Sequence, residues 1–307
     1  MAVVRKEIKM GNRFEQYLLH PIERPITDAD AKVEMICSKD NQIMDFFYES
    51  AYYRHDYKIC DTIYALPYNE FILFMSTNND DDVLGAKVKM EINGTELVFD
   101  RPFVVQVPAY VPHGKIEIFD VENPVFSYIA GFGKEHVGMP EANWNREPEL
   151  SIEEMILFNN AKDINDPHAN KVQHCVLTAL AGKTMKGEIS GVFRRFDATD
   201  GWLYVENAHT HGYPEALGFY GTDGWNPYEL GGNYTVFVGG HPFTIDKPTL
   251  GFFPAYVPHC PIMVNHIEKQ NFWNSFGKAI GAFNTAKSTE LYNIKYPGEG
   301  VELNEPW

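Results

Sequence analysis

Three histidines and one glutamate in the second half of the chain have the types and spacing of a metal site. His209 and His211 are two residues apart, so on an extended strand both side chains point to the same face. Glu215 follows four residues later, and His259 can return on a paired strand. Three imidazoles and one carboxylate form a ligand set suited to Fe, Mn, Ni, Co or Zn.

An internal duplication supports this interpretation. The hexapeptide Pro-Ala-Tyr-Val-Pro-His occurs at residues 108–113 and again at 254–259, an offset of 254 − 108 = 146. The same offset relates Leu84-Gly85 to Leu230-Gly231, and Asp100-Arg101-Pro102 to Asp246-Lys247-Pro248. The two halves of the chain are therefore expected to share one fold.

The motifs resemble those of the cupin superfamily, and the duplication resembles a bicupin. The family pattern pairs His-x-His-x(3,4)-Glu with Pro-x-Gly-x-x-His on neighbouring strands. His209, His211 and Glu215 match the ligands of the first motif, and His259 matches the ligand of the second. The sequence departs from the pattern where Tyr256 replaces a glycine, Leu203 replaces the leading glycine, and Met263 replaces the closing asparagine.

The resemblance implies an all-β fold of two tandem jelly-roll-like barrels with a few short helices. We expect an N-terminal barrel with an arm over residues 1–145 and a C-terminal, metal-binding barrel over 146–307. Short apolar runs broken by glycine, proline and asparagine between residues 71 and 132, and from 186 to about 276, favour strands. Ser151 and Glu154 have the spacing of a capping box, which predicts one helix at the start of the second half.

The first repeat lacks the paired histidines. Moving back 145 residues from Glu215, His211 and His209 leads to Glu70, Leu66 and Tyr64. Glu70 and His113 alone are too few ligands for a transition metal ion. We therefore expect a structural first barrel and one divalent transition metal per chain, in the second barrel. His55 is the other imidazole that could substitute there.

Composition narrows the classes of partner. The 307-residue chain has a net charge of −16, which argues against nucleic acid and anionic membranes, so we expect a small-molecule substrate. No apolar run suits a membrane span or a signal peptide, and Cys37, Cys60, Cys175 and Cys260 are scattered, as in reduced cytoplasmic proteins. Bicupins often dimerise, so the resemblance is compatible with a homodimer.

Aromatic and basic residues near the motifs are further candidates. Besides Glu215, we single out Tyr220 and Tyr256 as catalytic candidates, although aromatic residues in a barrel are commonly packing residues. One of Arg194 and Arg195 could point inward and orient an anion, or the pair could form a solvated strand edge.

Three classes of function stay open at this point. The ligand set is similar to that of bicupin dioxygenases, which act on aromatic, diketone-like or otherwise enolisable compounds. The first alternative is a non-redox lyase, isomerase, decarboxylase or hydrolase in which Glu215 moves a proton. The second is a binding protein for a metal or small molecule, without catalysis.

Overall fold

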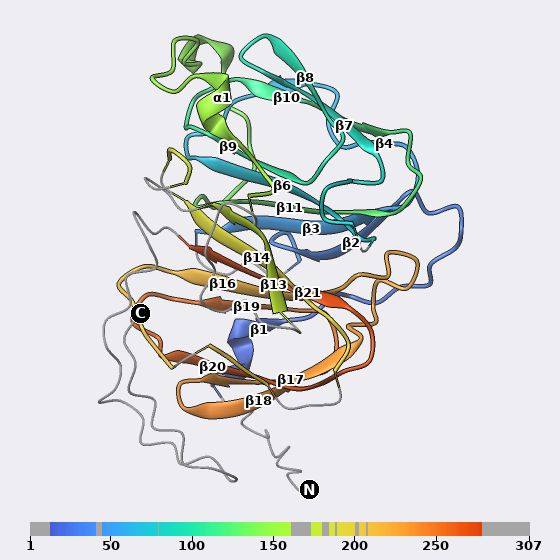
Figure 1. The fold of residues 1–307 in the computed structure, drawn as a ribbon. Helices are drawn as coiled ribbons and strands as arrows, with labels where there is room; N and C mark the ends of the chain where they lie inside the picture. The colour runs from blue at the N-terminus through green and yellow to red at the C-terminus, as the bar shows by residue number, and fades with distance from the viewer. Residues whose placement is uncertain are drawn as a thin grey trace, which may run out of the picture.

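The chain folds into two β-barrels stacked one above the other (Figure 1). The computed structural model describes residues 13–40, 45–78, 80–160, 173–179, 184–187, 189–199, 203–206 and 208–277. Nearly all regular structure in these residues is β-strand, which confirms the all-β prediction.

The first barrel consists of two antiparallel sheets. Its six-stranded sheet has the order β12 (Ile156–Phe158), β9 (Phe103–Val107), β6 (Glu70–Ser76), β11 (Val125–Gly131), β3 (Phe47–Tyr53) and β2 (Lys32–Cys37). Its second sheet has the order β4 (Tyr57–Lys58), β10 (His113–Phe119), β7 (Lys87–Ile92) and β8 (Thr95–Phe99), and β5 (Ile63–Tyr64) also pairs with β10.

The second barrel repeats this plan. Its six-stranded sheet has the order β1 (Leu18–Leu19), β19 (Thr249–Phe253), β16 (Glu215–Gly221), β21 (Asn271–Gly277), β14 (Ser190–Phe196) and β13 (Gln173–Ala179). Its four-stranded sheet has the order β15 (Leu203–Glu206), β20 (His259–Ile267), β17 (Gly232–Val238) and β18 (His241–Ile245).

Equivalent backbone hydrogen bonds establish the register of the duplication. The amide of Tyr110 donates to the Leu66 carbonyl at 2.7 Å, and the amide of Tyr256 donates to the His211 carbonyl at 2.8 Å. Both tyrosines have positive φ, 68° and 66°. The repeated hexapeptide therefore forms the same turn in both barrels, and Leu66 occupies the place of His211.

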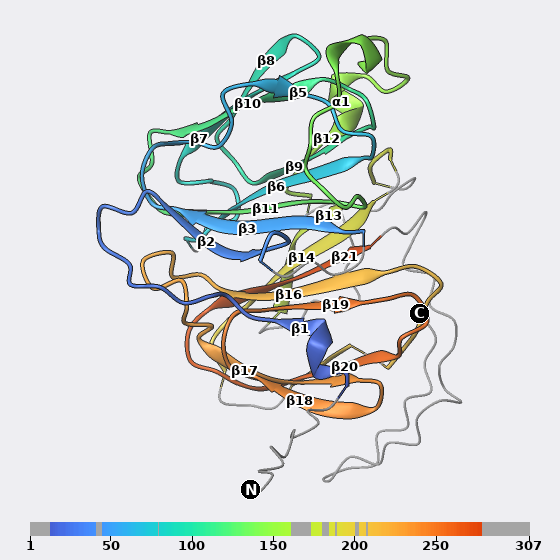
Figure 2. The same ribbon diagram turned by 180° about the vertical axis from the view of Figure 1, so that it is seen from behind.

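Each barrel includes a strand from beyond the predicted boundary between residues 145 and 146. Leu18 and Leu19 of β1 pair with β19 of the second barrel, and β12 pairs with β9 of the first. β1 and β12 occupy equivalent edges of the two six-stranded sheets. The N-terminal segment before the first barrel thus extends to the second barrel, as Figure 2 shows from behind.

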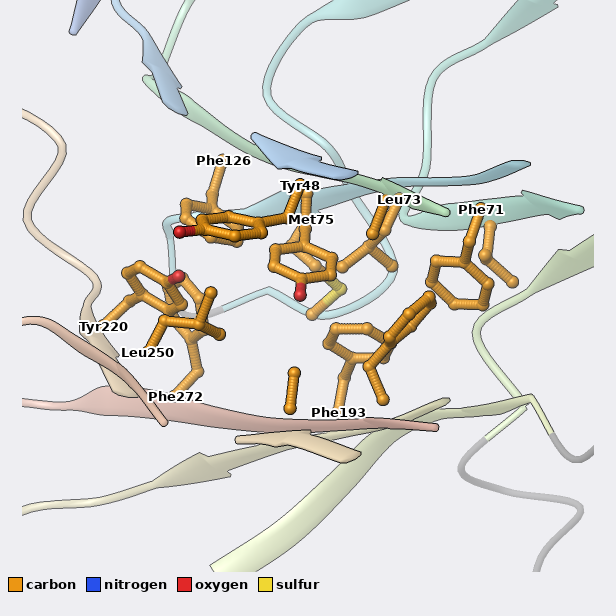
Figure 3. Close-up of a cluster of buried hydrophobic side chains, with 14 of the residues drawn as sticks. Tyr48, Phe71, Leu73, Met75, Phe126, Phe193, Tyr220, Leu250 and Phe272 are labelled. Carbon is orange, nitrogen blue, oxygen red and sulfur yellow. The ribbon is translucent and has the colours of Figure 1, made fainter. Parts of the chain in front are cut away.

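The two six-stranded sheets face each other across an apolar core. Side chains alternate between the faces of a strand, so Phe71, Leu73 and Met75 of β6 point to this shared core, whereas Ile72 and Phe74 point into the first barrel. In Figure 3, aromatic rings from both barrels meet there, and the Phe126 ring centroid lies 4.7 Å from those of Tyr220 and Phe272. This core joins the barrels into one packed unit.

Helices contribute little to the described structure. The capping box of Ser151 and Glu154 is present, but its helix α1 (Ile152–Met155) has only four residues and leads directly into β12. The two 3₁₀ turns are η1 (Glu15–Tyr17) and η2 (Glu141–Asn143). Within the described residues, no helix combines the length and apolarity needed to cross a membrane.

Candidate metal centre

The four predicted ligands meet inside the second barrel. Glu215 begins β16 and His259 begins β20, so each sheet supplies one of them. His209 lies opposite His259, and their amides and carbonyls exchange two hydrogen bonds of 3.0 Å. His211 follows two residues later and therefore projects to the same face as His209. All four side chains are buried.

The imidazoles converge on one carboxylate oxygen. The Nε2 atoms of His211, His259 and His209 lie 2.7, 2.9 and 3.7 Å from Oε2 of Glu215. The ligand atoms of the four residues all lie within 4.8 Å of one another. This separation is compatible with one shared ion, because metal–ligand distances of about 2 Å place the ligands of one ion this close together.

Hydrogen bonds on the far side of two rings fit a metal at Nε2. Nδ1 of His259 lies 2.8 Å from the Val257 carbonyl, and Nδ1 of His211 lies 2.6 Å from the Tyr213 carbonyl. A carbonyl can only accept a hydrogen bond, so Nδ1 carries the proton, and in a neutral ring the Nε2 lone pair points toward Glu215. The lone pairs of Nε2 and of the Glu215 oxygen Oε2 repel each other, and a divalent cation bound by both atoms removes this repulsion. The residues therefore fit a metal ion.

The electrostatic environment keeps His259 and Glu215 in metal-binding protonation states. Burial lowers the pKa of His259 to about 4, with a further lowering from His209, and Glu215 opposes this shift only in part. Burial alone raises the pKa of Glu215, but the interactions with the three surrounding imidazoles outweigh it and hold this pKa well below its ordinary value. At neutral pH, His259 is thus neutral and Glu215 is ionised.

Two supporting contacts were not predicted from the sequence. The Ser275 hydroxyl donates a 2.5 Å hydrogen bond to Oε1 of Glu215 from β21. The ring of Tyr213 stacks on His211, with centroids 3.9 Å apart and an interplanar angle of 7°. Ser275 pairs with Leu217 two residues after Glu215, so strand register brings it to the carboxylate, but the sequence does not reveal that register.

The two tyrosine candidates lie outside this cluster. Tyr220 is on the opposite face of β16 from Glu215, in the core between the barrels, and its hydroxyl donates to Ser50 at 3.2 Å. Tyr256 is 76% exposed, in the turn whose amide binds the His211 carbonyl. Tyr220 is therefore directed away from the four ligands. Tyr256 lies at the protein surface, in the turn that is bonded to His211.

The adjacent arginines point in opposite directions, as strand alternation requires. Arg194 is buried, and its guanidinium lies 5.7 Å from the ring centroid of Trp273, which belongs to the interior of the second barrel. Arg195 instead bridges the barrels: its Nη2 donates to the Ser76 carbonyl at 2.7 Å, and its Nε lies 2.5 Å from Asp81. Neither arginine forms a solvated edge.

The first barrel has a different polar cluster at the equivalent place. Both Glu70 and His113 are buried, and Nε2 of His113 contacts Oε2 of Glu70. The Tyr64 hydroxyl donates to the same oxygen at 3.1 Å, while Nε2 of His136 lies 2.7 Å from Oε1. His136 was not among the sequence candidates. His55 lies elsewhere, with Nε2 at 2.6 Å from the Asp28 carbonyl.

A second group of potential ligands lies on and beside β2. Glu34, Cys37 and Asp40 also bring ligand atoms within 4.8 Å of one another. Burial and a hydrogen bond to Asp40 raise the pKa of the Cys37 thiol to about 12, so it stays protonated and donates to both carboxylates. A protonated thiol is a poor metal ligand, and this group is a hydrogen-bonded surface cluster.

Comparison with known proteins gives matches at the level of structure. No family model matches the sequence, and a search of the curated proteins found no match. The structure is similar to that of AerE from Microcystis aeruginosa, with a TM-score of 0.51 and 12% identity over 85% of this chain and 98% of AerE. It is also similar to a point mutant of the Bacillus subtilis oxalate decarboxylase OxdC.

The second similarity has a TM-score of 0.53 and 10% identity, over 89% of this chain and 78% of the decarboxylase. At such identities, similarity demonstrates a shared fold and leaves activity undetermined. Two stacked barrels, a duplicated hexapeptide and a histidine-rich cluster inside the second barrel agree with that fold. The chain therefore has the tandem-barrel fold of the bicupins.

Proposed function

We propose that the chain is a metal-dependent enzyme that acts on a small organic substrate inside the second barrel. The observation that carries the proposal is the convergence of three imidazoles and one carboxylate within 4.8 Å. His209, His211, Glu215 and His259 would hold one divalent transition metal. This site would leave coordination positions for substrate, as catalytic metal sites do.

We further propose that the reaction is the dioxygenation of an aromatic, diketone-like or otherwise enolisable compound. A bound Fe(II) or related ion would supply the Lewis acidity and redox chemistry for such a reaction. Ser275 donates a hydrogen bond to Oε1 of Glu215, while Oε2 lies 2.7 and 2.9 Å from Nε2 of His211 and His259, where one ion would be shared. This anchoring favours a fixed ligand over a mobile proton carrier.

The apolar interior of the second barrel favours an apolar substrate. Buried side chains that share its interior cluster are Leu217, Phe219, Val236, Phe253, Ile262 and Trp273. An apolar wall excludes water and protects reactive intermediates from hydrolysis. The buried Arg194 guanidinium at Trp273 adds one positive charge, which favours a substrate that carries an anionic or enolate oxygen.

A non-redox reaction is the second candidate. It is favoured by the structural similarity to oxalate decarboxylase, because the same fold supports decarboxylation in that protein. The metal ligands here would serve either reaction, since several divalent ions accept the same residues. In the non-redox case the charge of Arg194 would orient a carboxylate substrate.

Oxygen dependence distinguishes the two candidates. Protein purified without added metal is analysed for its elements and then tested against a set of enolisable compounds and small carboxylates, with and without oxygen. We expect one metal per chain and turnover that consumes oxygen. A His209→Ala, His211→Ala double variant is the control, and it should lose both metal and turnover.

Two outcomes would overturn parts of the proposal. Undiminished turnover under strict anaerobiosis, or full activity with zinc, would replace the dioxygenase by a non-redox enzyme. Stoichiometric metal in the double histidine variant would remove the metal centre itself.

A further inference from the structure

A cavity of about 340 Å³ opens beside the polar cluster of the first barrel. Its apolar wall consists of Phe47, Ile59, Ile116 and Ile129, and its polar lining includes Lys32, Glu49, Cys60, Thr62, Tyr64 and His136. The volume is in the range of small-molecule sites, which combine an apolar wall with a few directed polar groups.

His136 is held in this cavity by a hydrogen bond and a ring stack. Nε2 of His136 lies 2.7 Å from Oε1 of Glu70, and the ring stacks on Phe47 with centroids 4.5 Å apart. The side chain is 30% exposed, and within the described residues Nδ1 has no hydrogen-bond partner. The ring therefore has one nitrogen anchored and the other available to a ligand.

Glu70 stabilises the protonated form of this ring. Burial raises the pKa of Glu70, but hydrogen bonds from His113 and His136 bring it to about 2. Burial lowers the pKa of His136, yet the Glu70 hydrogen bond and charge exceed this effect and raise it overall. Where the second barrel has three imidazoles for an ion, the first barrel has an imidazole whose protonated form is stabilised by a buried carboxylate.

The same residues do not assemble a metal site. Both oxygens of Glu70 are hydrogen bonded, by Tyr64 and His113 at Oε2 and by His136 at Oε1. Among the described residues, Glu70, His113 and His136 are not a group whose ligand atoms all lie within 4.8 Å of one another. Side chains of the protein thus fill the hydrogen-bonding positions of the Glu70 carboxylate, without a metal ion.

Lys32 also lines the cavity. Nζ of Lys32 forms an ion pair with Glu49 and lies 3.6 Å from Glu34. Lys32 and a protonated His136 offset the charges of Glu49 and Glu70, and both still have N–H groups that can donate to one more oxygen. A bound carboxylate would add one net negative charge to this cluster. Charge-assisted hydrogen bonds of this kind are about twice as strong as neutral ones.

We propose that the first barrel contains a metal-independent binding site for a small organic carboxylate. The carboxylate group binds between His136 and Lys32, and the apolar part of the ligand packs on the isoleucines and Phe47. This site is separate from the metal centre of the second barrel and does not depend on the reaction proposed for it.

Benzoate is a suitable probe, because its ring matches the apolar wall, and benzamide is the matched neutral molecule. Calorimetry on the full chain should show saturable benzoate binding, with benzamide about tenfold or more weaker, as expected for the loss of a charge-assisted contact.

Cys60 supplies a local readout, because its thiol lines the cavity and donates to the Thr62 carbonyl at 3.1 Å. Benzoate should slow alkylation of Cys60 by iodoacetamide, followed by mass spectrometry, and a Cys60→Ala variant identifies the peptide signal.

Variants then test whether His136 and Lys32 bind the carboxylate. His136→Gln and Lys32→Met should each weaken benzoate about tenfold or more, whereas Lys115→Met should not, because Lys115 is exposed and paired with Glu91 on the same barrel. The His209→Ala, His211→Ala variant should bind benzoate normally. Thermal unfolding of each variant shows that it is folded, and Lys32→Met carries the test if His136→Gln does not fold.

Several results would overturn the proposal. Affinity unchanged in both cation variants would place benzoate elsewhere, and binding lost in the second-barrel double variant would assign it to the metal centre. Zinc bound by that double variant and released by His136→Gln would make the first barrel a metal site. Absence of both binding and Cys60 protection with acetate, benzoate and succinate at millimolar concentrations would exclude a carboxylate site.

Discussion

Ser275 donates a 2.5 Å hydrogen bond to Oε1 of Glu215, on the side of the carboxylate away from the imidazoles. Oε2 is the oxygen that His211 and His259 approach. The serine thus fixes the orientation of the carboxylate while leaving the other oxygen directed at the ligand cluster. Hydrogen bonds that orient a metal ligand commonly contribute substantially to metal affinity.

Replacing Ser275 by alanine should weaken the metal site without removing a ligand. We expect metal affinity to fall about 10- to 100-fold, because Glu215 would lose its orienting partner. Competition with a chromophoric chelator measures this affinity. Ser50→Ala is the matched control, since the Ser50 hydroxyl of the first barrel is also buried but is bonded to Ile36 and Tyr220, away from the four ligands. Equal losses in the two variants would contradict a specific role for Ser275.

The stability of the metal-free protein should fall as the pH falls from 6.5 toward 4. Burial lowers the pKa of His259 from 6.5 to about 4, so the folded chain binds fewer protons than the unfolded chain between these values. The contribution of His259 is therefore intact above this window and is lost on acidification, by up to about 3 kcal/mol.

Urea unfolding of chelator-treated protein at several pH values measures this dependence. His259→Gln should flatten the slope between pH 6.5 and 4. The depressed pKa of Glu215 adds a loss of stability in the same direction but at lower pH, below its ordinary value of 4.5. A slope that is unchanged in the variant would assign the acid sensitivity to another group.

The two equivalent histidines should behave differently when truncated. His113→Ala should leave metal content at one ion per chain and cost about 3–5 kcal/mol of stability, because Glu70 would lose a partner while buried. His259→Ala should instead remove the metal. Elemental analysis and urea unfolding of both variants test this contrast. Two ions in the wild type, with one lost in the His113 variant, would show that both barrels bind metal.

Much of the fold and the ligand set follows from sequence periodicity. The two-residue spacing of His209 and His211, and the repeat offset that places Tyr64 opposite His113, both depend on regular strands. The same alternation places Tyr220 on the opposite face from Glu215, because an odd number of residues separates them. Strand alternation therefore directs Tyr220 into the core between the barrels, away from the four ligands.

Other features depend on tertiary register and could not be predicted. His136 follows β11 on a segment without periodicity, so nothing in the sequence connects it with Glu70. The two-residue strand β1 is too short to show a pattern, and its pairing with β19 becomes evident only when the two barrels are packed. His136 lines the first-barrel cavity, and β1 connects the N-terminal segment to the second barrel, so both features depend on contacts between residues far apart in the sequence.

Arg195 should be one of the residues that hold the barrels together. Its guanidinium contacts Ser76 and Asp81 of the first barrel and Gln270 of the second. Arg195→Ala would leave Asp81 without this partner, and we expect a loss of about 3–5 kcal/mol. Arg146→Ala, which removes an exposed ion pair with Glu141, should cost less than about 1 kcal/mol. Similar losses in urea unfolding of the two variants would contradict this role.

The two tyrosine candidates can be separated by removing one hydroxyl at a time. Tyr220→Phe should leave metal content and turnover unchanged and cost about 1 kcal/mol, because its hydroxyl is bonded to Ser50 in the core between the barrels. Tyr256 is on the turn beside His211, and a Cβ on Gly212 would lie 3.2 Å from its hydroxyl oxygen. Its hydroxyl is therefore the one of the two that a substrate at the metal centre can approach.

Tyr256→Phe should lower kcat about tenfold or more if that hydroxyl donates a proton, with metal content retained. Turnover that is lost in Tyr220→Phe and kept in Tyr256→Phe would reverse this assignment and require a path from the core to the metal centre.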